Sequence, residues 1–447
     1  MSNRVTLPRE IWVLVAAAVV VSLGYGIVAP VLPQFAKSFG VTTTAATVVV
    51  SAFAFMRLIF APASGRLSNL FGERWMYVIG IAMVATSSAA SGFAQSYWQL
   101  LVFRGLGGIG SVTFTVAAMS LIFKLAPPEG RGRASAAYGS GFLLGNICGP
   151  AVGALIAPLG YRWPFWIYAI LLGVAATIVF VMVPANVSGG TRTHSGESNT
   201  REARTSRGTT DAKPGHTSGN TSRNRRDTAN NADTIRSEQT PARESARSQT
   251  PMTIREALAV RRFKVVLLTA FAQGWTNMGV RVAVVPLLAA SISGAPGWLP
   301  GAALMFFAAG NGLALTRAGY FSDVYGRKPI VVVGLIISGI FTVIMGLWDV
   351  SAVVLIGSFF GGFGSGCIQP SQQGTVADIV GNRPGSQVVS FFQQSGDFGQ
   401  ILGPIVAGLM IDYSGYALAY GFSGAILLAV ALVWIFLVKE PTRRRRA

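Results

Sequence analysis

The 447-residue chain is poor in acidic side chains, cysteine and histidine. It has 17 Asp and Glu against 36 Lys and Arg, so its formal net charge is +19, although charged residues make up only 12% of the chain. Cys148 and Cys367 lie in apolar runs at non-equivalent places and predict small buried side chains rather than a disulfide. His194 and His216 belong to no metal-ligating cluster, and no nucleophile–base set is present. These absences disfavour an enzyme, and we expect no metal and no cofactor.

Long apolar runs dominate what is present. The chain is 51% hydrophobic and its mean hydropathy is +0.51. Runs of about 20 apolar residues recur, and each is long enough to cross a hydrocarbon core of about 30 Å. We therefore predict an all-α integral membrane protein whose twelve transmembrane helices lie at residues 10–34, 43–65, 74–93, 98–123, 132–157, 162–184, 264–290, 299–319, 328–348, 351–376, 385–411 and 415–438.

The positions of the basic residues indicate a membrane topology rather than nucleic-acid binding. Most Lys and Arg lie between the apolar runs, and every second short loop carries most of this charge. Basic loops mark the cytoplasmic side of integral membrane proteins. We expect a multi-pass protein of the cell (inner) membrane, with the lipid bilayer around it and both termini in the cytoplasm. Pro30 and Pro33 follow the first run without a small-residue cleavage site, which disfavours a cleaved signal peptide.

Residues 186–255 interrupt the pattern of spans. They are rich in Ser, Thr, Asn, Gly and Arg and nearly free of large apolar residues, so we expect a disordered cytoplasmic linker. It joins an N-terminal six-helix half, residues 1–185, to a C-terminal six-helix half, residues 256–447. A passive tether is the simplest interpretation, and binding of anionic lipids or phosphorylation are the alternatives.

The two halves repeat one another. Residues 65–150 and 319–404 align without a gap at an interval of 254 residues, and glycines recur at matching positions. Two like halves are a hallmark of secondary transporters. In the repeated segment the glycines are spaced four residues apart, which forms a smooth helix stripe that a neighbouring helix can approach closely. The stripe consists of Gly141, Gly145, Gly149 and Pro150 in the first half and of Gly399, Gly403 and Pro404 in the second. A plain packing seam is the alternative to a functional motif.

Four motifs resemble one family. Residues 65–74 and 319–328 resemble the loop signature of the major facilitator superfamily, and residues 23–33, 100–110 and 139–153 are similar to motifs of its twelve-span drug:proton antiporters. The resemblance implies a two-half helical fold that works by alternating access. The loop positions that it assigns are Gly65, Asn69, Gly72, Arg74, Gly319, Asp323, Gly326 and Arg327. Asn69 replaces the family's aspartate, which puts the usual latch of the first half in doubt.

Charges inside spans are costly, so they indicate function. Asp397 shares a helix face with Gln393 and Gln400 and is our candidate for the protonation site, with a fixed ion pair to an arginine as the alternative. Arg104 matches the family's span 4 arginine, which the resemblance implicates in proton coupling. Arg57 and Arg281 match no motif and are candidates for a substrate contact, a partner for Asp397, or a snorkelling side chain.

Polar side chains in the spans predict a cavity between the halves. The candidates are Tyr25, Arg57, Asn146, Asn277, Arg281, Gln369, Gln373, Gln393 and Gln400, and span 10 also carries Ser371, Gln372 and Thr375. Three cavity-facing arginines against one aspartate would favour neutral, zwitterionic or anionic substrates over simple cations.

The predicted function is secondary active transport. We expect a monomer that exports small amphipathic compounds such as drugs, driven by a proton gradient and by no cofactor. Export of an endogenous sugar, lipid precursor or siderophore is the alternative, followed by proton symport. A non-transporting membrane receptor or assembly factor is the alternative from a different class.

Overall fold

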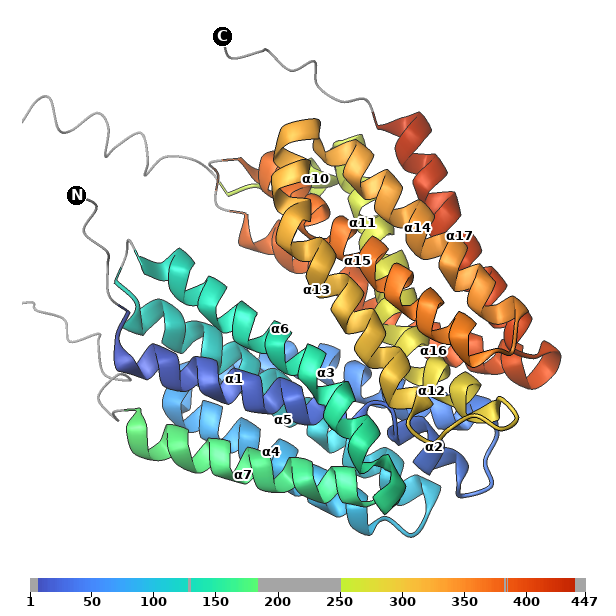
Figure 1. Ribbon diagram of the computed structural model, residues 1–447. Helices are drawn as coiled ribbons and strands as arrows, with labels where there is room; N and C mark the ends of the chain where they lie inside the picture. The colour runs from blue at the N-terminus through green and yellow to red at the C-terminus, as the bar shows by residue number, and fades with distance from the viewer. Residues whose placement is uncertain (1–6, 128–129, 184–250, 382, 384, 439–447) are drawn as a thin grey trace, which may run out of the picture. The chain divides into compact units, whose positions relative to one another are not determined.

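The computed structural model describes residues 7–127, 130–183, 251–381, 383 and 385–438. Most of the predicted linker, residues 186–250, lies outside the described residues. The membrane helices of both halves belong to one compact unit, which leaves out residues 189–252 and 382–384. Figure 1 colours the helices of the first half from blue to green and those of the second half from yellow to red.

The described part of the N-terminal half is helical throughout. Its elements are α1 (Arg9–Val28), α2 (Leu32–Lys37), α3 (Thr43–Phe71), α4 (Glu73–Phe93), α5 (Tyr97–Leu125), α6 (Arg131–Ile156), the short 3-10 helix Ala157–Leu159 and α7 (Trp163–Met182). The first predicted span divides into α1 and α2, with Pro33 in the first turn of α2. Proline is tolerated there because the first turn of a helix leaves its N–H groups unpaired.

The described part of the C-terminal half has one irregular span. Its elements are α10 (Ile254–Ala259), α11 (Arg261–Gln273), the π-helix η4 (Gly274–Val280), α12 (Arg281–Ser291), α13 (Leu299–Tyr325), α14 (Arg327–Leu347), α15 (Ser351–Val380), α16 (Ser386–Ser414) and α17 (Tyr416–Leu437). The predicted span 264–290 therefore consists of α11, η4 and α12. A π-helical segment within a span often marks a functional site, because it widens one turn of the helix.

The twelve predicted spans match these helices. Ten helical segments of the described residues are long and apolar enough to cross a membrane. The other two predicted spans are the one that η4 divides and α16, which carries Gln393, Asp397 and Gln400. Both exceptions contain polar residues that the sequence analysis assigned to a cavity.

The glycine stripes are packing surfaces in both halves. A Cβ atom on Gly149 would lie 2.5 Å from the carbonyl oxygen of Leu23 on α1, and one on Gly403 would lie 2.6 Å from that of Trp275 on η4. Both distances are too short for any side chain. The glycine stripe of α6 therefore packs against α1, and the glycine stripe of α16 packs against η4.

Helices α3 and α16 join the two halves at one end. The Asp412 carboxylate accepts hydrogen bonds from the backbone N–H groups of Thr43 (2.9 Å) and Thr44 (2.8 Å) and from the Thr44 hydroxyl (2.6 Å). Further along, the Ser51 hydroxyl donates to the carbonyl oxygen of Ile401 at 2.8 Å. The Asp412 contacts tie the first turn of α3 to the last turn of α16, and the Ser51 contact joins α3 to the middle of α16. The predicted topology places the first turn of α3 at the outer side of the membrane.

Candidate functional site

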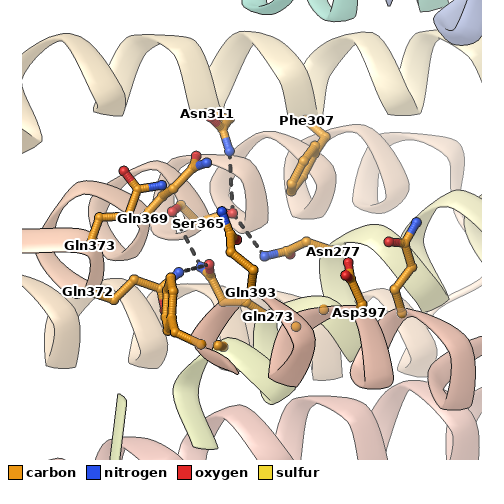
Figure 2. A pocket seen from close by; sticks show the side chains of 15 residues that line it. Gln273, Asn277, Phe307, Asn311, Ser365, Gln369, Gln372, Gln373, Gln393 and Asp397 are labelled. Carbon is orange, nitrogen blue, oxygen red and sulfur yellow. Dashed lines mark hydrogen bonds between the residues drawn. The ribbon is translucent and has the colours of Figure 1, made fainter. Parts of the chain in front are cut away.

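A polar cavity of about 190 Å³ lies among α11, η4, α13, α15 and α16. Figure 2 shows the side chains that line it. Amides predominate among them, with one carboxylate and two phenylalanines. The lining side chains are Gln273, Asn277, Phe307, Asn311, Ser365, Gln369, Gln372, Gln373, Phe392, Gln393, Asp397 and Gln400, together with Ala270, Gly274 and Gly396.

Ser365 is the centre of a hydrogen-bond network in this pocket (Figure 2). Its hydroxyl oxygen accepts from the side-chain amides of Asn277 (2.9 Å) and Asn311 (3.3 Å). Its backbone carbonyl accepts from Gln273 (3.4 Å), whose own oxygen accepts from Gln372 (3.1 Å). The network thereby fixes side chains from α11, η4, α13 and α15 around one point.

Two hydrogen-bond acceptors of this network receive no hydrogen bond from the described residues. The buried side-chain oxygens of Asn277 and Gln372 have no hydrogen-bond partner among the described residues. A buried acceptor without a partner costs about 1–3 kcal/mol. The pocket can therefore bind a compound that donates hydrogen bonds to these oxygens, and the amide N–H groups nearby can donate to acceptors of the same compound.

Asp397 is the only ionisable side chain among the described residues that line the pocket. It is half-buried on α16, and the charge that acts on it comes from Arg57 on α3, in the other half. Arg57 itself donates to the Ser111 hydroxyl at 3.1 Å. Within the described part of the chain no cation lies at ion-pair distance from the Asp397 carboxylate. The carboxylate is thus placed to change its protonation state without first breaking an ion pair.

The structure brings together six of the predicted site residues. Asn277, Gln369, Gln373, Gln393, Asp397 and Gln400 line one pocket, although they come from three separate spans. Tyr25, Arg57, Asn146, Arg104 and Arg281 do not line it. Sequence reasoning missed Gln273, Asn311 and Ser365. The spacing of Gln273 and Asn277, four residues apart on one helix, was a usable signal, whereas a lone Asn311 or Ser365 gives none.

The predicted intramembrane residues Arg104 and Arg281 lie outside the lining of this pocket. Arg104 and Arg281 are each only 3% exposed, and each guanidinium lies over a phenylalanine ring. Aromatic faces attract buried cations. The described lining of this pocket carries one negative group and no positive one, and the predicted substrate preference stays a prediction.

The loop motifs adopt matching backbones in both halves. Gly72 (φ 85°) separates α3 from α4, and Gly326 (φ 99°) separates α13 from α14. Only glycine adopts such values without strain. Gly65 and Gly319 are half-buried, with no atom within 4 Å of a Cβ added at either.

The basic residues of the loop motifs use different partners. Arg327 pairs with Asp378 of α15, with 3.1 Å between Nη2 and Oδ1. Arg74 donates instead to the carbonyl oxygen of Phe180 on α7, with its guanidinium 5.0 Å from the ring centroid. Glu73 forms an ion pair with Lys124 of α5 at 2.5 Å. The side chains of Asn69 and Asp323 lie outside the described residues. The role of these two loop positions in a conformational latch therefore stays a prediction.

The helical repeat and the polar pocket among the membrane helices are typical of membrane transporters. The sequence model of the Major Facilitator Superfamily matches residues 14–309 and 266–447, and the chain belongs to this superfamily. The chain is thus a multi-pass membrane protein of this superfamily.

Curated relatives include drug-resistance proteins. Multidrug resistance protein 3 of Bacillus subtilis (strain 168) is 36% identical over 107 residues, which are 24% of this chain and 21% of that protein. Quinolone resistance protein NorA of Staphylococcus aureus is 29% identical over 179 residues, which are 39% of this chain and 45% of that protein. The chain thus matches less than half the length of these relatives.

Solved transporters share the fold. A bacterial homolog of the human lysosomal transporter Spinster, in an inward-facing and unoccupied conformation, superposes with a TM-score of 0.66 at 14% identity, over 96% of this chain and 95% of that one. A POT family transporter in complex with 5-aminolevulinic acid gives a TM-score of 0.68 at 12% identity, over 96% of each chain.

Proposed function

We propose that this protein is a proton-coupled exporter of small amphipathic compounds, of the drug:proton antiporter type. The observation that carries the proposal is the single carboxylate, Asp397, in a pocket otherwise lined by amides and two phenylalanines. The names of the relatives, which concern resistance to several drugs and to quinolones, support export rather than uptake.

The proposed coupling uses Asp397 and alternating access. Substrate and proton compete for the pocket: protonation removes the charge of Asp397 on the outer side, and release of the proton on the inner side restores it. Arg57 of the other half acts on this charge, so moving the halves changes the stability of the ionised form. Each proton that moves inward down a 100 mV potential supplies about 2.3 kcal/mol. The proton gradient, and no bound cofactor, is the proposed energy source.

The orientation belongs to the same proposal. With both termini in the cytoplasm, the hydrogen bonds of Asp412 to Thr43 and Thr44 close the outer side. The pocket then receives its substrate from the cytoplasm or the inner leaflet, as export requires.

Proteoliposomes with an imposed pH gradient test this function. A panel of a quinolone, the permanent cation ethidium and a neutral disaccharide is offered to the wild type and to Asp397→Asn. We expect gradient-driven accumulation of at least one amphipathic compound by the wild type and its loss in the variant, while the substrate still binds. The matched control is Asp349→Asn, which removes an exposed carboxylate between α14 and α15 and should transport normally. Undiminished uphill transport by Asp397→Asn would show that coupling lies elsewhere.

The amide network favours a second candidate, export of a hydroxyl-rich endogenous compound such as a sugar. Asn277, Asn311 and Gln372 offer donors and unfilled acceptors of the kind that hydroxyl groups satisfy. In the same panel, transport of the disaccharide with no transport of the quinolone or ethidium would favour this candidate.

A further inference from the structure

Phe53 and Phe307 occupy the same position of the internal repeat. They lie 254 residues apart, on α3 and α13, which is the interval that relates the two halves. By the same interval Arg104 on α5 corresponds to Ser358 on α15, and Gly107 corresponds to Gly361. The position in the second half that corresponds to Arg104 therefore holds no arginine.

In the first half, the guanidinium of Arg104 lies over Phe53. Its central carbon is 4.7 Å from the ring centroid, and Arg104 is 3% exposed. Its Nε has no hydrogen-bond partner among the described residues. The Phe53 ring is thus one neighbour that stabilises this buried charge.

In the second half, the guanidinium of Arg281 lies over Phe307. Arg281 is also 3% exposed, its central carbon is 4.3 Å from that ring centroid, and its Nε likewise has no partner among the described residues. Its Nη2 donates to the Thr342 hydroxyl at 3.5 Å. A Cβ on Gly361 would lie 2.6 Å from Nη2, so the glycine leaves the space that the guanidinium fills.

In each half a guanidinium thus lies over the repeat-equivalent phenylalanine ring, but the two arginines come from non-equivalent helices. Arg104 comes from α5, whereas Arg281 is the first residue of α12, directly after the π-helix. The position that corresponds to Arg104 holds Ser358, which is fully buried and whose hydroxyl has no partner among the described residues. A buried guanidinium thus lies over the equivalent ring in each half, although the two arginines occupy non-equivalent sequence positions.

Neither arginine has a carboxylate partner. No ion pair of Arg104 or Arg281 is found in the described part of the chain. A charge inside the membrane is costly, and a neutral side chain of similar size would fill the same space at lower cost. A buried guanidinium lies over the equivalent phenylalanine ring in each half, and this arrangement indicates a role beyond packing.

We propose that Arg281 is the counterpart of Arg104 in the C-terminal half, a positioning residue that holds Phe307 in the wall of the pocket. Phe307 lies one helical turn before Asn311 on α13, and both line the pocket beside Asn277 of the π-helix. Arg281 joins the end of that π-helix to α13 through the ring and to α14 through Thr342. The inference rests on the proposed transport function for its effect on substrate, but the pairing of Arg281 with Phe307 is independent of it.

The test compares three variants in proteoliposomes, with the panel compound that the wild type transports. Arg281→Met removes the charge, and we expect KM to rise about tenfold or more, as loss of a desolvated cation–π contact implies, with the pH profile unchanged because Asp397 is intact. Arg281→Met combined with Ser358→Arg returns a guanidinium from the repeat-equivalent position, and we expect most of the affinity to return. The control Arg317→Met removes an exposed arginine from α13 and should leave KM within about twofold.

A second measurement does not depend on the substrate or on folding of the relocated variant. Thermal unfolding of purified Arg281→Met, Phe307→Leu and their combination forms a double-mutant cycle, and we expect non-additive shifts of Tm. An unchanged KM in Arg281→Met, or additive shifts in the cycle, would overturn the inference. If the wild type transports no panel compound, the proposed function fails while the cycle still decides whether Arg281 holds Phe307.

Discussion

Replacing Asp412 with alanine removes the carboxylate that joins α16 to the first turn of α3. In the wild type this side chain accepts three hydrogen bonds, from the N–H groups of Thr43 and Thr44 and from the Thr44 hydroxyl, at 2.6–2.9 Å. The carboxylate thus caps the first turn of α3 from the other half of the protein, in addition to Thr42, which is the N-cap residue of α3. It also lies at the positive end of the helix dipole.

The expected size of the effect follows from this capping role. Loss of an N-cap side chain costs about 1 kcal/mol, and Asp412 is exposed, so we use this value and no larger one. The substitution destabilises only the state in which α3 and α16 are joined, because the proposed alternating-access cycle breaks this contact when the outer ends separate. About 1 kcal/mol changes the ratio of closed to open outer ends about fivefold.

Distance measurements by double electron–electron resonance report this ratio. Spin labels at Ser38 and Tyr413, both exposed, lie in the loop before α3 and at the end of α16, and Cys148 and Cys367 are first replaced by serine. We expect a longer-distance population to grow about fivefold in Asp412→Ala. Asp412→Asn, which keeps one acceptor oxygen, should lie between alanine and the wild type.

The control for this measurement is Asp349→Ala, which removes an exposed carboxylate from the segment between α14 and α15. It should leave the distance distribution unchanged. An identical distribution in Asp412→Ala and the wild type would show that these hydrogen bonds do not set the closed state, and the reasoning from helix capping would be refuted.

Further predictions concern packing, one ion pair and the linker. Gly145→Leu should lower Tm and transport sharply because a Cβ there would lie 2.5 Å from the carbonyl oxygen of Val19, whereas Gly139→Leu, with no atom within 4 Å of its added Cβ, should be tolerated in the same assays. Glu73→Gln should lower Tm by a few degrees, because the buried carboxylate that pairs with Lys124 is lost, and Lys124→Gln should do the same. Deletion of residues 190–250 should leave membrane expression and transport largely intact, since a tether tolerates changes of length, and loss of either would refute the passive role.

Much of the fold was predictable because the membrane imposes it. Inside a bilayer a backbone must satisfy its own hydrogen bonds, so apolar runs of the right length become helices whatever their neighbours are. The repeat was also visible, since glycines such as Gly72 and Gly326 are required by a local backbone conformation that no other residue adopts easily. The division of span 7 by a π-helix was not predicted, because Gly274 and Asn277 look like ordinary residues of an amphipathic helix.

The sequence by itself determined which side chains are polar inside the membrane. Asp397, Gln393 and Gln400 stood out because the free-energy cost of a polar side chain in the membrane depends on the residue itself and not on how the helices pack. Only the tertiary structure decided what these side chains meet. Three-dimensional packing gathered Asn311 and Ser365 around the pocket, and it placed the Arg281 guanidinium over Phe307, which lines the pocket. A guanidinium on a long side chain can reach several neighbouring helices, so its partner depends on how the helices pack and not on its place in the sequence.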